Sequence, residues 1–76
     1  MSPRDPLRSI KAELVAQIEP ALAAEPQKFI GARIGLAQAD VSRLLLRKLD
    51  RFSIDRILSI GIRLGYRPTV SLERPR

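Results

Sequence analysis

The chain has 76 residues, with 14 Lys and Arg against 8 Asp and Glu, no Cys and no His, and a net charge of +6 at pH 7. A chain this short forms a single domain with a small core. The lack of Cys and His excludes disulfides and argues against a zinc site, so oligomerisation is the remaining common way to stabilise such a domain.

The N-terminal third predicts one long helix. Residues 1–6 are expected to be a flexible N-terminus, in which Asp5 suits an N-cap and Pro6 suits the first helical position. Apolar residues then recur every three or four positions, at Leu7, Ile10, Leu14, Ile18 and Leu22. Pro20 lies inside this stripe and costs about 3 kcal/mol in a regular helix interior. Because the apolar period continues past Pro20, we predict one kinked helix, and a helix ending at Glu19 is the alternative.

A second, short helix is predicted from Pro26 to about Ile34. Its inward-facing residues are expected to be Phe29, Ile30 and Ile34. Gly35 follows, at a position where a left-handed backbone conformation commonly ends a helix. The sequence therefore predicts a tight turn at Gly35.

A third helix is predicted from about Gln38 to Leu46. Its buried stripe follows the spacing i, i+3, i+4 and consists of Val41, Leu44 and Leu45. A basic loop over residues 47–51 follows. Helix, tight turn and helix together predict a helix-turn-helix over about 26–46.

A fourth helix is predicted to begin after Ser53, which suits an N-cap. Phe52 and Ile57 flank that cap at the spacing of a hydrophobic staple. The helix continues through an apolar stripe of Ile54, Ile57, Leu58, Gly61 and Leu64, and Gly65 is expected to end it.

Residues 68–73 alternate apolar and polar side chains, which indicates a short β-strand. Val70 and Leu72 would share one face, and Thr69 and Ser71 the other. A single strand needs a partner, so we expect the same strand of a second copy to pair with it. A frayed tail is the alternative.

Positive charge is concentrated around the predicted helix-turn-helix. Residues 28–67 hold nine of the 14 Lys and Arg residues but only three of the eight Asp and Glu residues. This distribution is typical of a domain that binds phosphates, and a basic soluble domain with charged faces is the alternative. The sequence shows neither a secretory signal nor the run of about 20 apolar residues of a membrane span, so we expect a cytoplasmic protein without membrane contact.

Residues 27–48 resemble the helix-turn-helix of the phage-repressor/Cro-like (XRE) family. The matching residues are Gln27, Ile34-Gly35-Leu36, Gln38, Val41-Ser42-Arg43-Leu44 and Lys48. Downstream, Phe52-Ser53-Ile54-Asp55, Leu64-Gly65 and the short strand resemble small HigA-type antitoxins and related regulators. The resemblance covers about residues 10–72. It implies an operator-binding regulator, with a cognate toxin as a further partner if the chain is an antitoxin.

The outward face of the third helix carries the expected DNA base contacts, which are Gln38, Ala39, Ser42 and Arg43. Gln pairs with the adenine edge and Arg with the guanine edge, and a small apolar side chain touches the thymine methyl. Arg43 is expected to reach either a base or a phosphate, and Ser42 either of these or neither. Asp40 either complements the helix dipole or accepts from cytosine.

The expected DNA backbone contacts are Gln27, Lys28, Arg33, Arg47, Lys48 and Arg51, of which Gln27 follows from the resemblance alone. Such contacts position a protein on DNA without specifying sequence. The chain departs from the family pattern at four positions. Ala37 gives the third helix no side-chain N-cap, Gly31 stands in place of Ala, Leu46 in place of a polar residue and Arg47 in place of Gly.

These observations predict an all-α, four-helix helix-turn-helix domain over residues 7–67, with a C-terminal strand over 68–73 that pairs across a symmetric homodimer. The dimer interface is expected to include Ile60, Leu64, Thr69, Val70, Ser71 and Leu72, together with part of Ile62. The expected function is transcriptional repression by sequence-specific binding of double-stranded DNA at an inverted-repeat operator, as the antitoxin and autorepressor of a toxin–antitoxin operon. A protein-interaction module without specific DNA binding is the alternative.

We expect no catalytic residues, metal or cofactor. Histidine and cysteine are absent, which removes the commonest general base and the thiol nucleophile. The acidic residues are scattered singly along the chain. The sequence therefore does not predict an enzyme.

Overall fold

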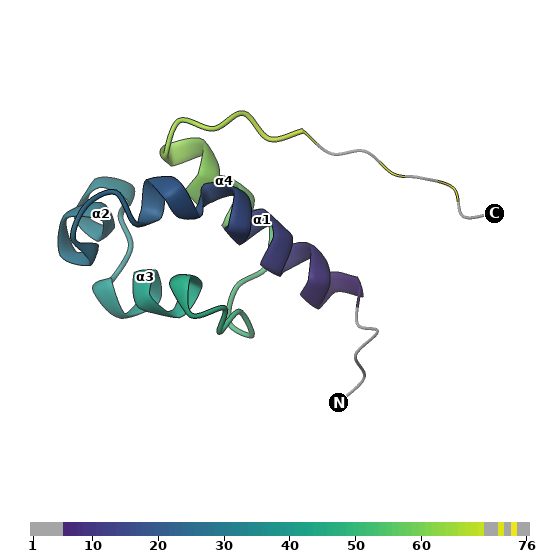
Figure 1. The fold of residues 1–76 in the computed structure, drawn as a ribbon, viewed down its shortest axis with the longest axis horizontal. Helices are drawn as coiled ribbons and strands as arrows, with labels where there is room; N and C mark the ends of the chain where they lie inside the picture. Colours follow the sequence, from purple (N-terminus) through teal and green to yellow (C-terminus); the bar gives the residue numbers. More distant parts are fainter. Residues whose placement is uncertain (1–5, 70–71, 73, 75–76) are drawn as a thin grey trace.

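Four helices and their connections make up the part of the chain that the computed structural model describes, which is residues 6–69, 72 and 74. The helices are α1 (Pro6–Leu22), α2 (Gln27–Ile34), α3 (Gln38–Leu45) and α4 (Ile54–Arg63). Helix α1 packs against both α4 and α3, and α2 packs against α3 (Figure 1). The predicted all-helical, four-helix architecture is thus confirmed.

The core is made only of apolar side chains, and no polar or charged residue among those described is buried. Every helix contributes to it, together with the segment between α3 and α4. Its members are Val15, Ile18, Leu22, Ile30, Ile34, Val41, Leu44, Leu49, Phe52, Ile57 and Ile60. Because a domain of this size has a small free energy of unfolding, the loss of any one of these side chains is expected to remove a large part of it.

Helix α1 continues through Pro20 and ends at Leu22, as the apolar period predicted. The predicted inward-facing stripe is buried only in the C-terminal part of α1. Leu7 and Ile10 are 55% and 43% exposed, whereas Val15 is fully buried. The reason is length: 17 residues extend about 25 Å, and the N-terminal end of α1 projects past the helices that it packs against (Figure 1).

Helix α2 ends where the sequence predicted, since Gly35 adopts a left-handed conformation (φ 68°) and its N–H bonds to the Gly31 carbonyl. The prediction that Phe29 faces inward is wrong, because Phe29 is 55% exposed. Two turns of helix offer one narrow inward stripe, and Ile30 and Ile34 fill it with 1% and 2% exposure.

Helix α3 begins without a side-chain N-cap at Ala37, as predicted, and ends at Leu45, one residue before the predicted end. Val41 and Leu44 are fully buried, whereas Leu45 is half-buried. Arg47 follows in a left-handed conformation (φ 60°). The XRE pattern that residues 27–48 resemble has Gly at this position, and Gly adopts such a backbone without strain.

Helix α4 begins at the predicted cap, where the Ser53 hydroxyl accepts a hydrogen bond of 3.1 Å from the Arg56 N–H. Phe52 and Ile57, the two residues of the predicted staple, are each 1% exposed. Arg63 donates from Nη1 to the Ile34 carbonyl at 2.8 Å. Helix α4 thereby satisfies a carbonyl at the C-terminal end of α2.

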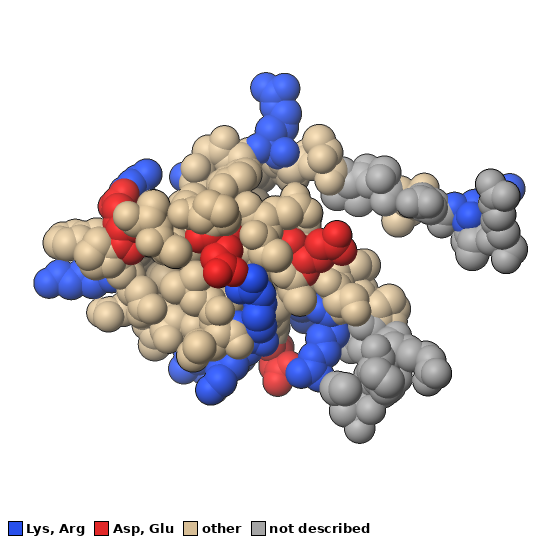
Figure 2. Space-filling view, viewed as in Figure 1, with Lys and Arg blue, Asp and Glu red and all other residues tan. Residues whose placement is uncertain are grey.

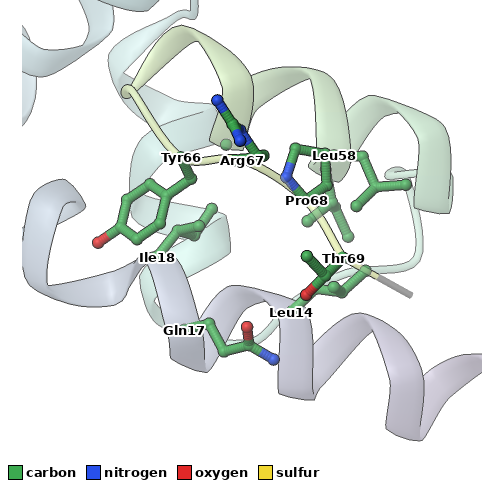
Figure 3. A pocket seen from close by; sticks show the side chains of 10 residues that line it. Leu14, Gln17, Ile18, Leu58, Tyr66, Arg67, Pro68 and Thr69 are labelled. Atoms are coloured by element: carbon green, nitrogen blue, oxygen red, sulfur yellow. The ribbon is translucent and has the colours of Figure 1, made fainter. Parts of the chain in front are cut away.

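The predicted strand over 68–73 is not formed in the part that the structure describes: Thr69 and Leu72 have no regular secondary structure, and Val70 and Ser71 lie outside the described residues. A lone strand has no backbone partner within the single chain. Residues 66–69 instead run beside α1 and α4, where they line a cavity of about 60 Å³ with Leu14, Gln17 and Ile18 (Figure 3). This cavity is far smaller than the roughly 300–1,000 Å³ of small-molecule sites.

Candidate nucleic-acid interface

The outward face of α3 is formed by the four residues expected to read bases. Gln38 and Ala39 are exposed, and Ser42 and Arg43 are half-buried. The opposite face of the helix is held in the core by Val41 and Leu44. Because residues at i, i+1, i+4 and i+5 lie on one side of a helix, the structure brings these four residues together on one surface.

A network of charged side chains crosses this surface. Asp40 accepts from Arg43 Nη1 at 2.5 Å through Oδ1, and its Oδ2 lies 3.6 Å from Arg56 Nη2. The Arg56 guanidinium in turn lies 4.9 Å from the centre of the Phe52 ring. Sequence reasoning placed Arg56 in no functional role. The i, i+3 spacing of Asp40 and Arg43 was a signal for their pairing, but no local pattern links α3 to α4.

The three candidate contacts on α2 lie at different parts of that helix. Gln27 is half-buried at its first turn, and Lys28 beside it is exposed. The Lys28 ammonium lies 5.7 Å from the centre of the exposed Phe29 ring. Arg33, whose side chain is 61% exposed, forms an ion pair with Glu25. Within residues 6–69 no hydrogen bond joins Gln27 to Gln38.

The basic segment after α3 contains two kinds of residue. The Arg47 guanidinium donates to the carbonyls of Leu44 and Leu45, at 3.3 and 3.4 Å, and forms an ion pair with Glu19 of α1. Its side chain is 33% exposed. Arg47 therefore joins the end of α3 to α1, and its role as a phosphate contact stays a prediction.

Lys48 and Arg51 are exposed instead, and within residues 6–69 neither forms an ion pair or a side-chain hydrogen bond. Their charges are therefore open to solvent. Lys and Arg side chains line the lower edge of the face in Figure 2, under α3 and the segment that follows it, with acidic side chains beside some of them. The surface is thus positive but not uniformly so.

The residues expected at a dimer interface are placed unequally. Ile60 is 4% exposed and belongs to the core of its own chain, so its side chain has little surface left for a second copy. Leu64 is half-buried against that core. Ile62 and Leu72 are 56% and 94% exposed. The exposed apolar surface at the end of α4 therefore lies on Ile62 rather than on Ile60.

No group of three or more His, Cys, Asp or Glu side chains is arranged to hold a metal ion in the part of the chain that the structure describes. None of the described helices is long and apolar enough to cross a membrane.

The model of a helix-turn-helix domain family matches residues 1–73, and the chain belongs to this family. Membership of this family suggests DNA binding. In DNA-binding helix-turn-helix domains the second helix of the motif enters the major groove. The finer resemblance to XRE and HigA-type regulators stays a prediction. No curated protein and no solved structure shows detectable similarity to the chain.

Proposed function

We propose that this protein is a sequence-specific, double-stranded DNA-binding transcriptional repressor that inserts α3 into the major groove. The observation that carries this proposal is the two-sided character of α3. Gln38 and Ala39 are exposed at its N-terminal end, where recognition helices contact base edges, while Val41 and Leu44 anchor it in the core with no exposed surface.

The proposed base contacts are those of the outward face. Gln38 pairs with adenine, Arg43 with guanine, Ala39 with a thymine methyl, and Ser42 with a base or phosphate. The exposed cations Lys28, Arg33, Lys48 and Arg51 supply sequence-independent attraction to phosphates, with Gln27 at the start of α2 and Arg47 as further candidates. We propose no catalytic role, because His and Cys are absent from the chain.

We propose further that two copies bind an inverted repeat with half-sites about one helical turn apart. One recognition helix contacts few base pairs, so two linked half-sites raise both affinity and selectivity. The contact is expected where α4 and the tail expose apolar side chains. We expect Ile62, Leu64, Thr69 and Leu72 to take part in it. The other two predicted interface residues, Val70 and Ser71, lie outside the described residues.

A second candidate role is that of an antitoxin that also binds a toxin protein. It is implied by the HigA-type resemblance and favoured by a further observation. Leu7, Ile10 and Leu46 expose 55%, 43% and 63% of their surface. Co-expression with the product of a neighbouring gene, followed by measurement of a stoichiometric complex, tests this role, and a neighbour that neither binds nor poisons cells would contradict it.

The test of the main proposal is selection of bound duplexes from a random pool at near-physiological salt. We expect enrichment of an inverted repeat and reduced enrichment with Gln38→Ala. Recovery of no sequence, with only weak and salt-sensitive binding, would overturn specific readout. It would leave a basic protein-interaction module.

A further inference from the structure

We propose that Asp40 is a positioning residue for base recognition: it holds Arg43 in a fixed orientation and ties it to Arg56 of α4, so that α4 contributes to base selectivity. This inference rests on the DNA-binding function proposed above. It assigns a role to an acidic residue that otherwise opposes DNA binding, and to an arginine outside the helix-turn-helix.

The geometry joins the two arginines through one carboxylate. Oδ1 of Asp40 accepts from Arg43 at 2.5 Å, and Oδ2 lies 3.6 Å from Arg56 Nη2. The Asp40 side chain is 21% exposed, against 36% for Arg43 and 45% for Arg56. The carboxylate therefore lies deeper than the two guanidinium groups that it joins.

The far end of this network is anchored in the core. The Arg56 guanidinium lies 4.9 Å from the centre of the Phe52 ring, and Phe52 is 1% exposed. A cation held over an aromatic ring and beside a carboxylate loses much of its freedom. Arg56 thus provides a fixed point against which Asp40 is oriented.

The simpler explanation of Asp40, a favourable charge at the start of a helix, does not account for this arrangement. The charge of Asp40 complements the helix dipole wherever its side chain lies in the first turn, so this effect requires no pairing with two arginines. Among residues 6–69 no backbone N–H donates to Asp40, and both oxygens face arginines instead.

Stability does not account for the arrangement either. Ion pairs at this level of exposure add little to stability, because solvent screens them. A carboxylate next to DNA also repels phosphates. We infer that Asp40 preorganises Arg43. A bidentate contact with guanine requires one orientation of the guanidinium plane. If Asp40 already holds that orientation in the free protein, binding does not cost the conformational entropy of the Arg43 side chain.

Asp40 also lowers the positive charge that Arg43 and Arg56 present. Two cations that share one anion attract phosphates less than two free cations do. The carboxylate therefore disfavours nonspecific binding while it favours the specific contact, and both effects raise selectivity.

The experiment compares Asp40→Asn with Asp55→Asn. Asp55 is an ideal control because it also lies in the first turn of its helix, is exposed, and has no ion pair within residues 6–69. Affinity is measured for the selected operator, for its single base-pair variants and for an unrelated duplex, at several salt concentrations. Thermal melts of each variant check that it is folded.

We expect Asp40→Asn to reduce discrimination about fivefold or more at one base pair, a loss within the discrimination of roughly 5–150-fold that a bidentate contact provides. Binding to the unrelated duplex is expected to strengthen, with a salt slope steeper by up to about 0.9 as a cation is released to phosphate. Asp55→Asn should leave discrimination unchanged.

A double variant identifies the residue through which Asp40 acts. Arg43→Ala and Asp40→Asn should relax the same base pair, with no further loss when they are combined, and Arg56→Gln should relax it in part. Loss at a base pair that Arg43 does not read would overturn the proposal in favour of direct cytosine contact. Unchanged discrimination in Asp40→Asn would also overturn the proposal, and would leave Asp40 only its favourable charge at the start of α3.

The free protein gives a readout that does not depend on DNA. We expect ¹⁵N relaxation of Arg43 Nε to show restricted motion in the native protein, and faster motion in Asp40→Asn but not in Asp55→Asn. Equal mobility in all three would overturn the positioning role. An operator search that fails while Arg43 remains ordered would instead contradict the proposed function.

Discussion

At the scale of single residues, the two helical glycines, Gly31 and Gly61, are expected to respond differently to substitution by Ala: the free energy of unfolding falls at one and not at the other. A Cβ added to Gly31 would lie 2.4 Å from the Leu36 carbonyl oxygen, a backbone atom that cannot move independently. The close approach is built into the turn, because the Leu36 N–H bonds to the Gly31 carbonyl at 2.8 Å. A Cβ added to Gly61 would meet only the Ile18 Cγ2 methyl, at 3.4 Å.

We therefore predict that Gly31→Ala lowers the free energy of unfolding by roughly 1–3 kcal/mol, because the overpacking cost exceeds the gain in helix propensity of about 1 kcal/mol. Gly61→Ala is the matched control and should leave stability unchanged or raise it by up to about 1 kcal/mol. Urea denaturation measures both. A stabilised Gly31→Ala would contradict the close approach of residue 31 to the Leu36 carbonyl oxygen.

Gln38 gives the corresponding residue-scale prediction for DNA. Gln38→Ala should weaken operator binding by about 1–3 kcal/mol and relax the preference at one base pair, since the bidentate contact to adenine is lost. Because Gln38 is exposed, the variant should fold like the native protein, and a thermal melt checks this. Specific binding that survives unchanged would exclude α3 as the recognition helix.

At the scale of elements, the end of α3 is joined to α1 by Arg47. Its guanidinium bonds to two α3 carbonyls and to Glu19, whereas Lys48 beside it has no ion pair within residues 6–69. The structure thus gives these two adjacent cations different surroundings, although the sequence alone does not distinguish them.

Lys48→Ala should flatten the dependence of log affinity on log salt by about 0.9, because one phosphate contact is lost. Arg47→Gly, which suits the left-handed backbone at this position, should flatten that slope by less, because the Arg47 guanidinium is shared with Glu19. It should also alter the unfolding free energy. The measurement is fluorescence anisotropy over a salt series. A slope reduced equally by both changes would establish Arg47 as a phosphate contact.

The helices themselves could be predicted from the sequence because their signals are local. The cap at Ser53, the turn at Gly35 and the stripe of Val41 and Leu44 each depend on neighbours within one or two turns. The outward face of α3 followed from the same period. Local pattern was sufficient to place the candidate base contacts on one surface.

The remaining features depend on elements that are distant in the sequence. Among the described residues no other element packs over Phe29 or Leu7, and periodicity alone does not reveal this. The contacts of Arg56 with Asp40 and of Arg47 with Glu19 join different helices. A strand at residues 68–73 would need a second chain, so its prediction concerned an assembly rather than a fold.

At the scale of the whole molecule, the proposed dimer is tested through an exposed residue. Ile62→Asp should preserve the fold, because Ile62 is 56% exposed, but should lower self-association and operator affinity. Leu46→Asp, at a residue 63% exposed on another part of the surface, is the control for self-association alone, because a carboxylate beside Lys48 would itself weaken DNA binding. Sedimentation velocity over a range of concentrations measures the assembly without DNA. A monomer at every concentration in the native protein would contradict the dimer.

The bond from Arg63 to the Ile34 carbonyl has a consequence for protein engineering. Through this bond a side chain of α4 packs against the turn between α2 and α3. The contact is close, because a Cβ added to Gly35 would lie 3.0 Å from the same guanidinium. A peptide that spans only the two helices would lack this contact as well as the core. Grafting the helix-turn-helix onto another scaffold would therefore require α4 as well. The smallest part of this protein that could be transferred as a DNA-binding unit is nearly the entire chain.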